Sequence, residues 1–201
     1  MTTRILVWDI PTRLFHWLLA ASFAGTFLTS ESESFMNVHV ALGYTMIGLI
    51  AFRVLWGLAG TRYARFSSFA FGPSSVLAYL KSLFTRSPKH YVGHNPAGSW
   101  MVYGLLLFGL ITGATGYATY NEMGGEWLKE LHEGIAVAML GLVSVHIAGV
   151  LASSLLHREN LVRSMITGYK TGEPGQGICR PKWIIGAGLI AGVAILWSSI
   201  I

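Results

Sequence analysis

Charged residues are scarce in this chain, and their scarcity narrows the class of protein. Only 11% of the 201 residues are Asp, Glu, Lys or Arg, whereas 53% are hydrophobic and the mean hydropathy is +0.54. A soluble domain carries roughly a quarter charged residues. The few charges lie between long apolar runs, which predicts an integral membrane protein that spans a lipid bilayer.

Cysteine is almost absent as well, since Cys179 is the only one. A single cysteine cannot form a disulfide within the chain. The CxxCH signature that attaches c-type heme covalently is also missing. Neither a disulfide within the chain nor covalent attachment of this kind is therefore expected.

Five apolar runs are readable, and each is close to the ~20 residues that a helix needs to cross the hydrocarbon core. They lie at Leu14–Thr29, Val38–Leu58, Trp100–Tyr120, Ile135–Leu156 and Trp183–Ile201. A cleaved signal peptide is the alternative for the first run, but the segment 30–34, Ser-Glu-Ser-Glu-Ser, offers no small-x-small cleavage site. We therefore predict an all-α transmembrane helical bundle, formed by one domain over residues 1–201.

The basic residues are distributed very unevenly between the two sides of this bundle. Twelve of the 14 Lys and Arg residues fall before the first run, between the second and third runs, or between the fourth and fifth runs. A thirteenth, Arg53, lies within the second run near its C-terminal end, on the same side of the membrane. Only Lys129 falls on the other side, which carries Glu residues instead. By the positive-inside rule the N-terminus is cytoplasmic in a bacterial inner membrane, and five spans put the C-terminus outside. The net charge of +5 is thus a topology signal and implies no nucleic-acid partner.

The long inner connection contains one further helical pattern. Residues 73–84 place Val76, Leu77, Leu80, Leu83 and Phe84 at helical spacing. This pattern predicts either an amphipathic helix at the membrane interface or an ordinary packing helix.

Histidine is the residue type that points to chemistry, because an intramembrane histidine is costly unless it is partnered. His132 and His146 belong to the fourth run, 14 residues apart. That spacing is a rise of about 21 Å and a rotation about 40° short of four turns. Both rings therefore point to nearly the same face, one near each membrane surface. Topology then puts His16 at the inner level with His146, and His39 at the outer level with His132.

Two levels with two histidines each are typical of bis-histidine heme ligation in a bundle core. Heme iron that only carries electrons takes a strong ligand at both axial positions, and neutral imidazole is one. Gly43, four residues after His39, and Gly149, three after His146, would let a flat porphyrin approach the backbone. The third run carries no ligand and is expected to act as wall and packing. Taken singly, each histidine would more simply be a hydrogen-bonded packing residue.

Other metal chemistry fits the same histidines less well. A single four-histidine metal site is excluded by the rise of about 21 Å. Two separate zinc sites would each need further ligands, which Glu133 could supply only at the outer level. A proton relay usually includes buried Asp or Glu, and no carboxylate lies in the middle of a run.

Several short motifs occur in a fixed order along the chain. They are Val7-Trp8-Asp9 through Arg13-Leu14-Phe15-His16-Trp17, His39 to Tyr44, Arg53-Val54-Leu55-Trp56-Gly57, Tyr63-Ala64-Arg65-Phe66, Gly93-His94-Asn95-Pro96, His132-Glu133 and His146. As an ordered set they resemble the bacterial cytochrome b561 family, which includes the b-type cytochrome subunits of nickel-iron hydrogenases. The resemblance implies a four-helix core over about residues 4–170 that binds two b hemes through the four histidines. The run at 183–201 extends beyond that core as an additional C-terminal span.

The resemblance also implies partners. It implies exchange with a quinone pool and with a redox protein, such as a hydrogenase, a c-type cytochrome or another oxidoreductase. Arg13 and Arg53 either pair with heme propionates or snorkel to lipid headgroups. His94 either fixes its loop or contacts a heme propionate or a quinone. The Gly-xxx-Gly motifs at 109–113 and 188–192 serve packing within the chain or a homodimer.

The leading prediction is a diheme b-type cytochrome that carries electrons across the membrane in a respiratory chain, between quinone and a redox protein. The first alternative is a stand-alone superoxide:quinone oxidoreductase, which would make the chain an enzyme in its own right. The second is a histidine-based metal or proton transporter.

Overall fold

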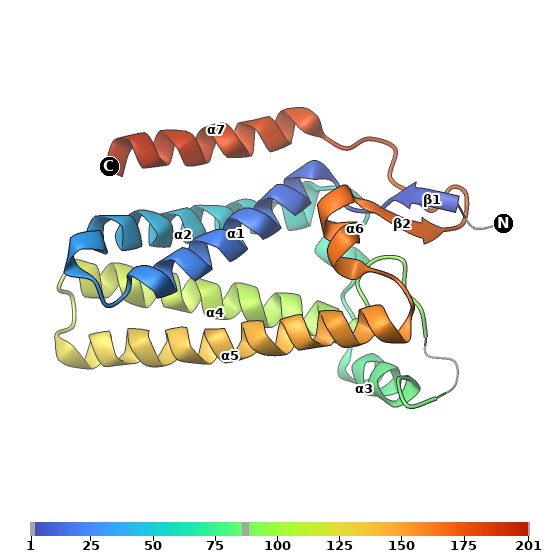
Figure 1. Cartoon of the computed structure of the whole chain (residues 1–201), viewed down its shortest axis with the longest axis horizontal. Helices are drawn as coiled ribbons and strands as arrows, with labels where there is room; N and C mark the ends of the chain where they lie inside the picture. The colour runs from blue at the N-terminus through green and yellow to red at the C-terminus, as the bar shows by residue number, and fades with distance from the viewer. Residues whose placement is uncertain (1–2, 86–88, 201) are drawn as a thin grey trace.

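Long helices lying side by side make up most of the computed structural model, which describes residues 3–85 and 89–200 (Figure 1). Successive long helices alternate in direction, so that the C-terminal end of the last one lies at the opposite end of the bundle from the N-terminal strand (Figure 1). The long helices are α1 (Ile10–Thr29), α2 (Met36–Ala59), α4 (Pro96–Tyr120), α5 (Glu126–Leu156) and α7 (Trp183–Ile200). The predicted helical bundle is therefore confirmed. Arg86, one of the residues in the charge count, and Ile201 lie outside the described residues.

Four of these helices are long and apolar enough to cross a membrane, judged by length and composition. They are the helical stretches Glu33–Ala59, Pro96–Tyr120, Glu126–Leu156 and Trp183–Ile200. The first predicted span, α1, has 20 residues but is less apolar, because it carries polar side chains such as Thr12, Arg13 and His16. It nevertheless runs along α2 inside the bundle, as a spanning helix would (Figure 1).

Local sequence signals explain where the helices begin. Asp9 precedes α1 and accepts a hydrogen bond from the Thr12 backbone N–H at 2.8 Å, with a proline in the first turn. Asn95 precedes α4 in the same way and accepts from the Gly98 N–H at 2.7 Å. Such side chains satisfy the free N–H groups of a helix N-terminus. Both helices consequently start four residues before the apolar runs of the sequence do.

Three layers of side chains repeat at seven-residue intervals in the bundle interior. Seven residues correspond to a rise of about 10 Å along a helix. In order along the bundle, the layers contain His39 and His132; Phe23, Met46 and Met139; and His16, Arg53 and His146. The middle layer is an apolar cluster supported by Leu19, Phe27, Phe108 and Val143. The two histidine levels are thus separated by a dry layer.

One end of the bundle carries elements that the sequence did not predict. Strand β1 (Thr3–Leu6) pairs antiparallel with β2 (Tyr169–Gly172), and α6 (Leu161–Thr167) precedes β2 (Figure 1). The carbonyl oxygen of Gly168 accepts hydrogen bonds from the Val7 and Trp8 N–H groups at 2.8 and 3.0 Å. Gly168 has a φ of 87°, and a Cβ there would lie 2.6 Å from the Trp8 oxygen, so glycine is required. We call this end, which holds β1, β2 and α6, the basic end.

The short helix α3 (Pro73–Ser82) forms where the 73–84 pattern predicts one. Tyr79 on α3 is buried, and α3 packs against α4, whereas Leu77 and Leu80 stay exposed. One face of α3, with Tyr79, therefore packs against the protein, while a second face, with Leu77 and Leu80, is apolar and exposed. That second face fits the interfacial interpretation.

The fifth long helix is packed into the bundle. Its Gly186 lies against Ile10 of α1, and its Trp197 Nε1–H donates to Thr45 Oγ1 of α2 at 2.9 Å. On α4, a Cβ at Gly109 would lie 2.8 Å from Ile50, and Gly113 likewise faces α2. The first Gly-xxx-Gly motif therefore serves packing within the chain.

Candidate functional site

The inner histidines meet in the structure. The ring centroids of His16 on α1 and His146 on α5 lie 6.3 Å apart, with their planes tilted by 57°. One iron bonded to a nitrogen of each ring, with bonds of about 2 Å and ring nitrogens about 1 Å from their centroids, would separate the centroids by about 6 Å. The spacing therefore fits two imidazoles that could together hold one heme iron. His16 Nδ1 is buried and has no hydrogen-bond partner among the described residues.

The outer histidines are each held by the backbone of a neighbouring helix. His39 Nδ1 lies 3.0 Å from the Thr26 carbonyl oxygen of α1, and His132 Nδ1 lies 3.1 Å from the Thr112 carbonyl oxygen of α4. The two histidines belong to the same layer of the bundle, on α2 and α5. His132 Nδ1 also lies 3.1 Å from Thr115 Oγ1.

These contacts decide which nitrogen of each outer ring is free. A carbonyl oxygen can only accept, so Nδ1 of His39 and of His132 carries the proton and donates it. In a neutral imidazole the other nitrogen, Nε2, then keeps its lone pair. Metal-bound histidines are oriented in this way by carbonyl partners. Both outer rings therefore have an unprotonated Nε2.

Glycines shape the surroundings of the outer pair. A Cβ at Gly116 of α4 would lie 2.9 Å from His132 Cε1, so the ring rests directly on this glycine. In contrast, a Cβ at Gly43 of α2 would meet no atom within 4 Å, and Gly149 of α5 is equally open. The open glycines fit the predicted close approach of a flat porphyrin, and Gly116 is a support that the sequence did not reveal.

Arg53 lies at the inner level and is enclosed by protein. It is 2% exposed, so its side chain does not reach out to lipid headgroups, and snorkelling is the wrong interpretation for it. Its guanidinium carbon lies 4.7 Å from the centre of the Phe66 ring. Both of its terminal nitrogens are buried and have no hydrogen-bond partner among the described residues. A buried cation with free donors requires an anion, which a heme carboxylate would supply.

Arg13 differs from Arg53 because it is partly tied to the chain. Its Nη1–H group donates to the Ile166 carbonyl oxygen of α6 at 2.5 Å, while Nε lies buried and unpartnered among the described residues. The carboxylate of Asp9 interacts electrostatically with both arginines. Arg13 therefore joins α1 to α6 and retains one donor for a further acceptor.

Asp9 was not identified as a site residue from the sequence. It is fully buried and accepts hydrogen bonds from Trp56 Nε1 at 3.1 Å and from Thr61 Oγ1 at 2.6 Å. It thereby fixes the start of α1 to the end of α2, beside Arg53. The sequence offered two signals, the Val7-Trp8-Asp9 motif and the position before Ile-Pro, and neither assigns Asp9 a role beyond a helix cap.

His94 lies in the loop before α4, close to the inner level. Its ring packs between Trp8 at 4.8 Å and Phe69 at 4.2 Å, measured between centroids, and its Nδ1 is buried without a partner among the described residues. Burial, and then the positive charges of Arg53 and Lys170, lower the pKa of His94 to about 3. The ring is therefore neutral and keeps a buried nitrogen available.

The structure does not assemble an alternative metal centre. Within residues 3–85 and 89–200, no group of three or more His, Cys, Asp or Glu side chains is placed to hold a metal ion. Glu133 therefore does not complete a zinc site with the outer histidines. Each histidine pair offers two imidazoles, which is the number that a heme iron could use and fewer than the four ligands of a closed zinc site.

Comparisons with known proteins identify a matching family model and several similar sequences. The family model described as prokaryotic cytochrome b561 matches residues 7–168. A protein of Azotobacter vinelandii named probable Ni/Fe-hydrogenase B-type cytochrome subunit is 26% identical, over 84% of this chain and 89% of its own length. Proteins of the same kind from Cupriavidus necator, 26% identical over 82% and 86%, and from Escherichia coli K12, 22% identical over 85% and 92%, are also similar. No solved structure matches the chain.

Proposed function

The chain belongs to the prokaryotic cytochrome b561 family of membrane b-type cytochromes, and on that premise we propose that it binds two b hemes and carries electrons across the membrane. One heme is assigned to His16 and His146, the other to His39 and His132. The observation that carries the proposal is the 6.3 Å spacing of the inner rings, which fits two imidazoles on one iron. Bound heme supplies the one-electron chemistry, which no side chain here provides.

The protein's own residues prepare each site before the cofactor arrives. At the outer level, backbone carbonyls hold His39 and His132 with Nε2 free, so no reorientation is needed on binding. At the inner level, Arg53 offers buried donors for a carboxylate. Because a buried unpaired cation is costly, we propose that a heme propionate is its partner. Arg13 is assigned the same role through its free Nε.

The apolar middle layer has a separate task. Phe23, Met46 and Met139 fill the space between the two levels. The levels are about 21 Å apart along α5, from the rise per residue of a helix. A dry layer blocks water and protons between the levels while electrons cross it. We propose that this insulation lets the protein move charge without leaking protons.

The orientation follows from the charges at the two ends of the bundle. The basic end is assigned to the cytoplasm and the opposite end, with its exposed glutamates, to the outside of a bacterial inner membrane. The N-terminus is then cytoplasmic. Since α7 packs on α1 and α2, we propose that residues 1–201 form a single domain, with the core at about 4–170 and the span at 183–201 as parts of it.

Redox partners are proposed from the relatives. Because those relatives are named as hydrogenase cytochrome subunits, we propose that a nickel-iron hydrogenase is the redox protein and a quinone is the other partner. Hydrogen-dependent quinone reduction by vesicles that contain both proteins tests this. Quinone reduction with superoxide but without hydrogenase would instead assign the stand-alone oxidoreductase function.

Heme counting tests the central proposal. We expect the pyridine hemochromogen assay to give two b hemes per purified chain. His146→Ala and His132→Ala should each leave one heme, and a redox titration should show that the remaining heme differs between them. His157→Ala, outside both pairs on the same chain segment, is the matched control and should keep both. A wild-type chain that binds no heme, or a His132 variant that keeps two, would contradict the proposal.

A further inference from the structure

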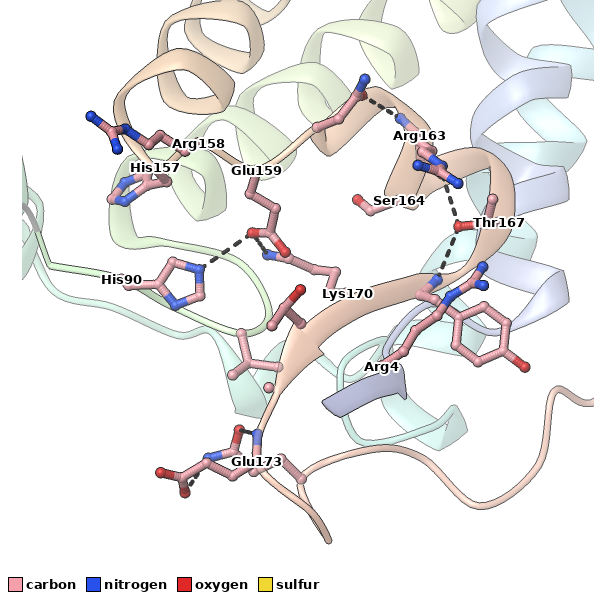
Figure 2. Close-up of a pocket in the computed structure, with 16 residues that line it drawn as sticks. Arg4, His90, His157, Arg158, Glu159, Arg163, Ser164, Thr167, Lys170 and Glu173 are labelled. Atoms are coloured by element: carbon pink, nitrogen blue, oxygen red, sulfur yellow. Dashed lines mark hydrogen bonds and ion pairs between the residues drawn. The ribbon is translucent and has the colours of Figure 1, made fainter. Parts of the chain in front are cut away.

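A large cavity opens at the basic end, away from both histidine pairs. Its volume is about 800 Å³, and its walls come from β1, the loop before α4, the turn between α5 and α6, α6 itself and β2 (Figure 2). None of the four histidines assigned to heme lines it. The cavity therefore needs an explanation of its own.

Positive charge dominates the cavity wall. The charged side chains that line it are Arg4, Arg158, Arg163, Lys170, Glu159 and Glu173. Glu159 lies at the centre of Figure 2, where its Oε2 is 3.0 Å from Lys170 Nζ and 3.3 Å from His90 Nε2. Within the described residues, no carboxylate forms an ion pair with Arg4, Arg158 or Arg163. Three arginines of the described wall therefore have no carboxylate partner, and the Arg4 guanidinium among them lies 4.5 Å from the centre of the Tyr169 ring.

The backbone at Arg158 is held in an unusual conformation. Arg158 has a φ of 51°, in the left-handed region that glycine or asparagine adopts more easily. Placing an arginine there costs on the order of 1 kcal/mol. The strained turn directs the Arg158 side chain beside His157 at one side of the cavity, while Arg163 extends from α6 on the other (Figure 2).

Two exposed apolar side chains lie close in sequence to arginines of this cavity. Leu155 at the end of α5 is 80% exposed, and Ile166 of α6 is 59% exposed. Leu155 precedes Arg158 by three residues, and Ile166 follows Arg163 by three. A ligand that combines an anionic head with apolar chains would match both surfaces, whereas a free anion would match only the first.

We propose that this cavity binds a phosphate group, and that an anionic phospholipid headgroup is its source. Guanidinium groups bind phosphate oxygens in a bidentate fashion, and basic pockets at the ends of membrane helices hold anionic headgroups. The lipid would clamp β1, α6 and the end of α5 together at the cytoplasmic surface. The proposal rests on the membrane location of the chain and is independent of heme ligation.

Direct titration tests the proposal. The heme-loaded full chain, in neutral detergent micelles, is titrated with short-chain phosphatidylglycerol, with phosphatidylcholine of the same chain length and with inorganic phosphate, and binding is read by native mass spectrometry. The test variant is Arg158→Gly with Arg163→Gln. The matched control is Arg180→Gln with Lys182→Gln, two exposed cations outside the cavity, with the same loss of charge.

We expect phosphatidylglycerol to bind and the test variant to bind about 30-fold more weakly, at roughly a factor of five per basic residue. The control should bind as the wild type does. Because glycine relieves the strain at position 158, the Arg158→Gly change should not lower the thermal unfolding midpoint, which separates lost binding from lost folding. Competition by inorganic phosphate at similar concentration would support the site but assign it to a soluble phosphate. Equal binding of phosphatidylcholine, or equal weakening in the control, would overturn the proposal.

Discussion

Replacing Gly116 by alanine is the most direct test of how the outer heme site is built. Gly116 on α4 lies against the His132 ring, and an added Cβ would lie 2.9 Å from Cε1 and 3.3 Å from Nδ1. The favourable van der Waals distance between two carbon atoms is about 3.5–4.0 Å, so the ring must move away from α4 by roughly 0.8 Å. His132 would then leave the position that its hydrogen bonds define.

The size of the effect follows from those hydrogen bonds. His132 Nδ1 lies 3.1 Å from both Thr112 O and Thr115 Oγ1, which belong to the same helix as Gly116. A movement of about 0.8 Å away from that helix takes both contacts beyond hydrogen-bond range. Each lost bond costs about 1 kcal/mol and the overpacking about 1–3 kcal/mol more. The sum, about 3–5 kcal/mol, corresponds to an outer site that is weaker by roughly 150-fold or more.

The assay is heme content combined with a redox titration of the purified protein. Gly116→Ala should lose the outer heme, or shift its potential, while the inner heme is unchanged. Gly104→Ala is the matched control, because it lies on the same helix and its Cβ would meet only Leu142 at an ordinary 3.4 Å. A Gly116→Ala protein with two hemes and wild-type potentials would refute the reasoning, and so would a control that loses as much.

Three further perturbations test other parts of the structure. Asp9→Ala removes the cap of α1 and leaves the Trp56 indole without its acceptor, so we expect a loss of about 3 kcal/mol, visible as a lower thermal midpoint of heme release. Trp197→Phe removes the bond from α7 to Thr45 and should cost about 1 kcal/mol in the same assay, while a wild-type midpoint would show that this bond does not anchor α7. For His94, burial lowers the folded-state pKa to about 3, below the ordinary 6.5, so the unfolded chain binds more protons between these values. The stability that depends on a neutral His94 is fully present above about pH 6.5 and is lost as pH falls toward 3. His94→Asn should therefore weaken the pH dependence of the thermal unfolding midpoint between pH 4 and 7.

The pairing of the inner histidines could be predicted from the sequence for a simple reason. The rise and rotation of a helix fix where His132 and His146 lie relative to one another, and the alternation of spans then fixes which of His16 and His39 shares each level. Only helix geometry and topology enter, and both are local properties or follow from counting spans. The same helix geometry places Gly43 on the helical face of His39, and the approach of a porphyrin there stays a prediction.

Contacts between elements far apart in the sequence could not be obtained in this way. Strand β1 pairs with β2 across more than 160 residues, and neither four-residue segment has a pattern that singles out the other. The burial of Arg53 was equally open, because an arginine near a helix end is compatible with lipid or with protein. The tertiary structure decides between them, because it buries Arg53 and places its guanidinium beside the Phe66 ring.

The third span shows most clearly why such contacts matter for function. Its sequence carries no histidine, so the pattern of ligands assigned it nothing beyond packing. In the structure it supplies the Thr112 carbonyl that selects the tautomer of His132 and the glycine on which that ring rests. A carbonyl group is present at every residue and carries no sequence signature, so its role depends entirely on which ring faces it. The helix that carries no histidine therefore determines how His132 of its neighbour is oriented, and Gly116 is where that dependence can be measured.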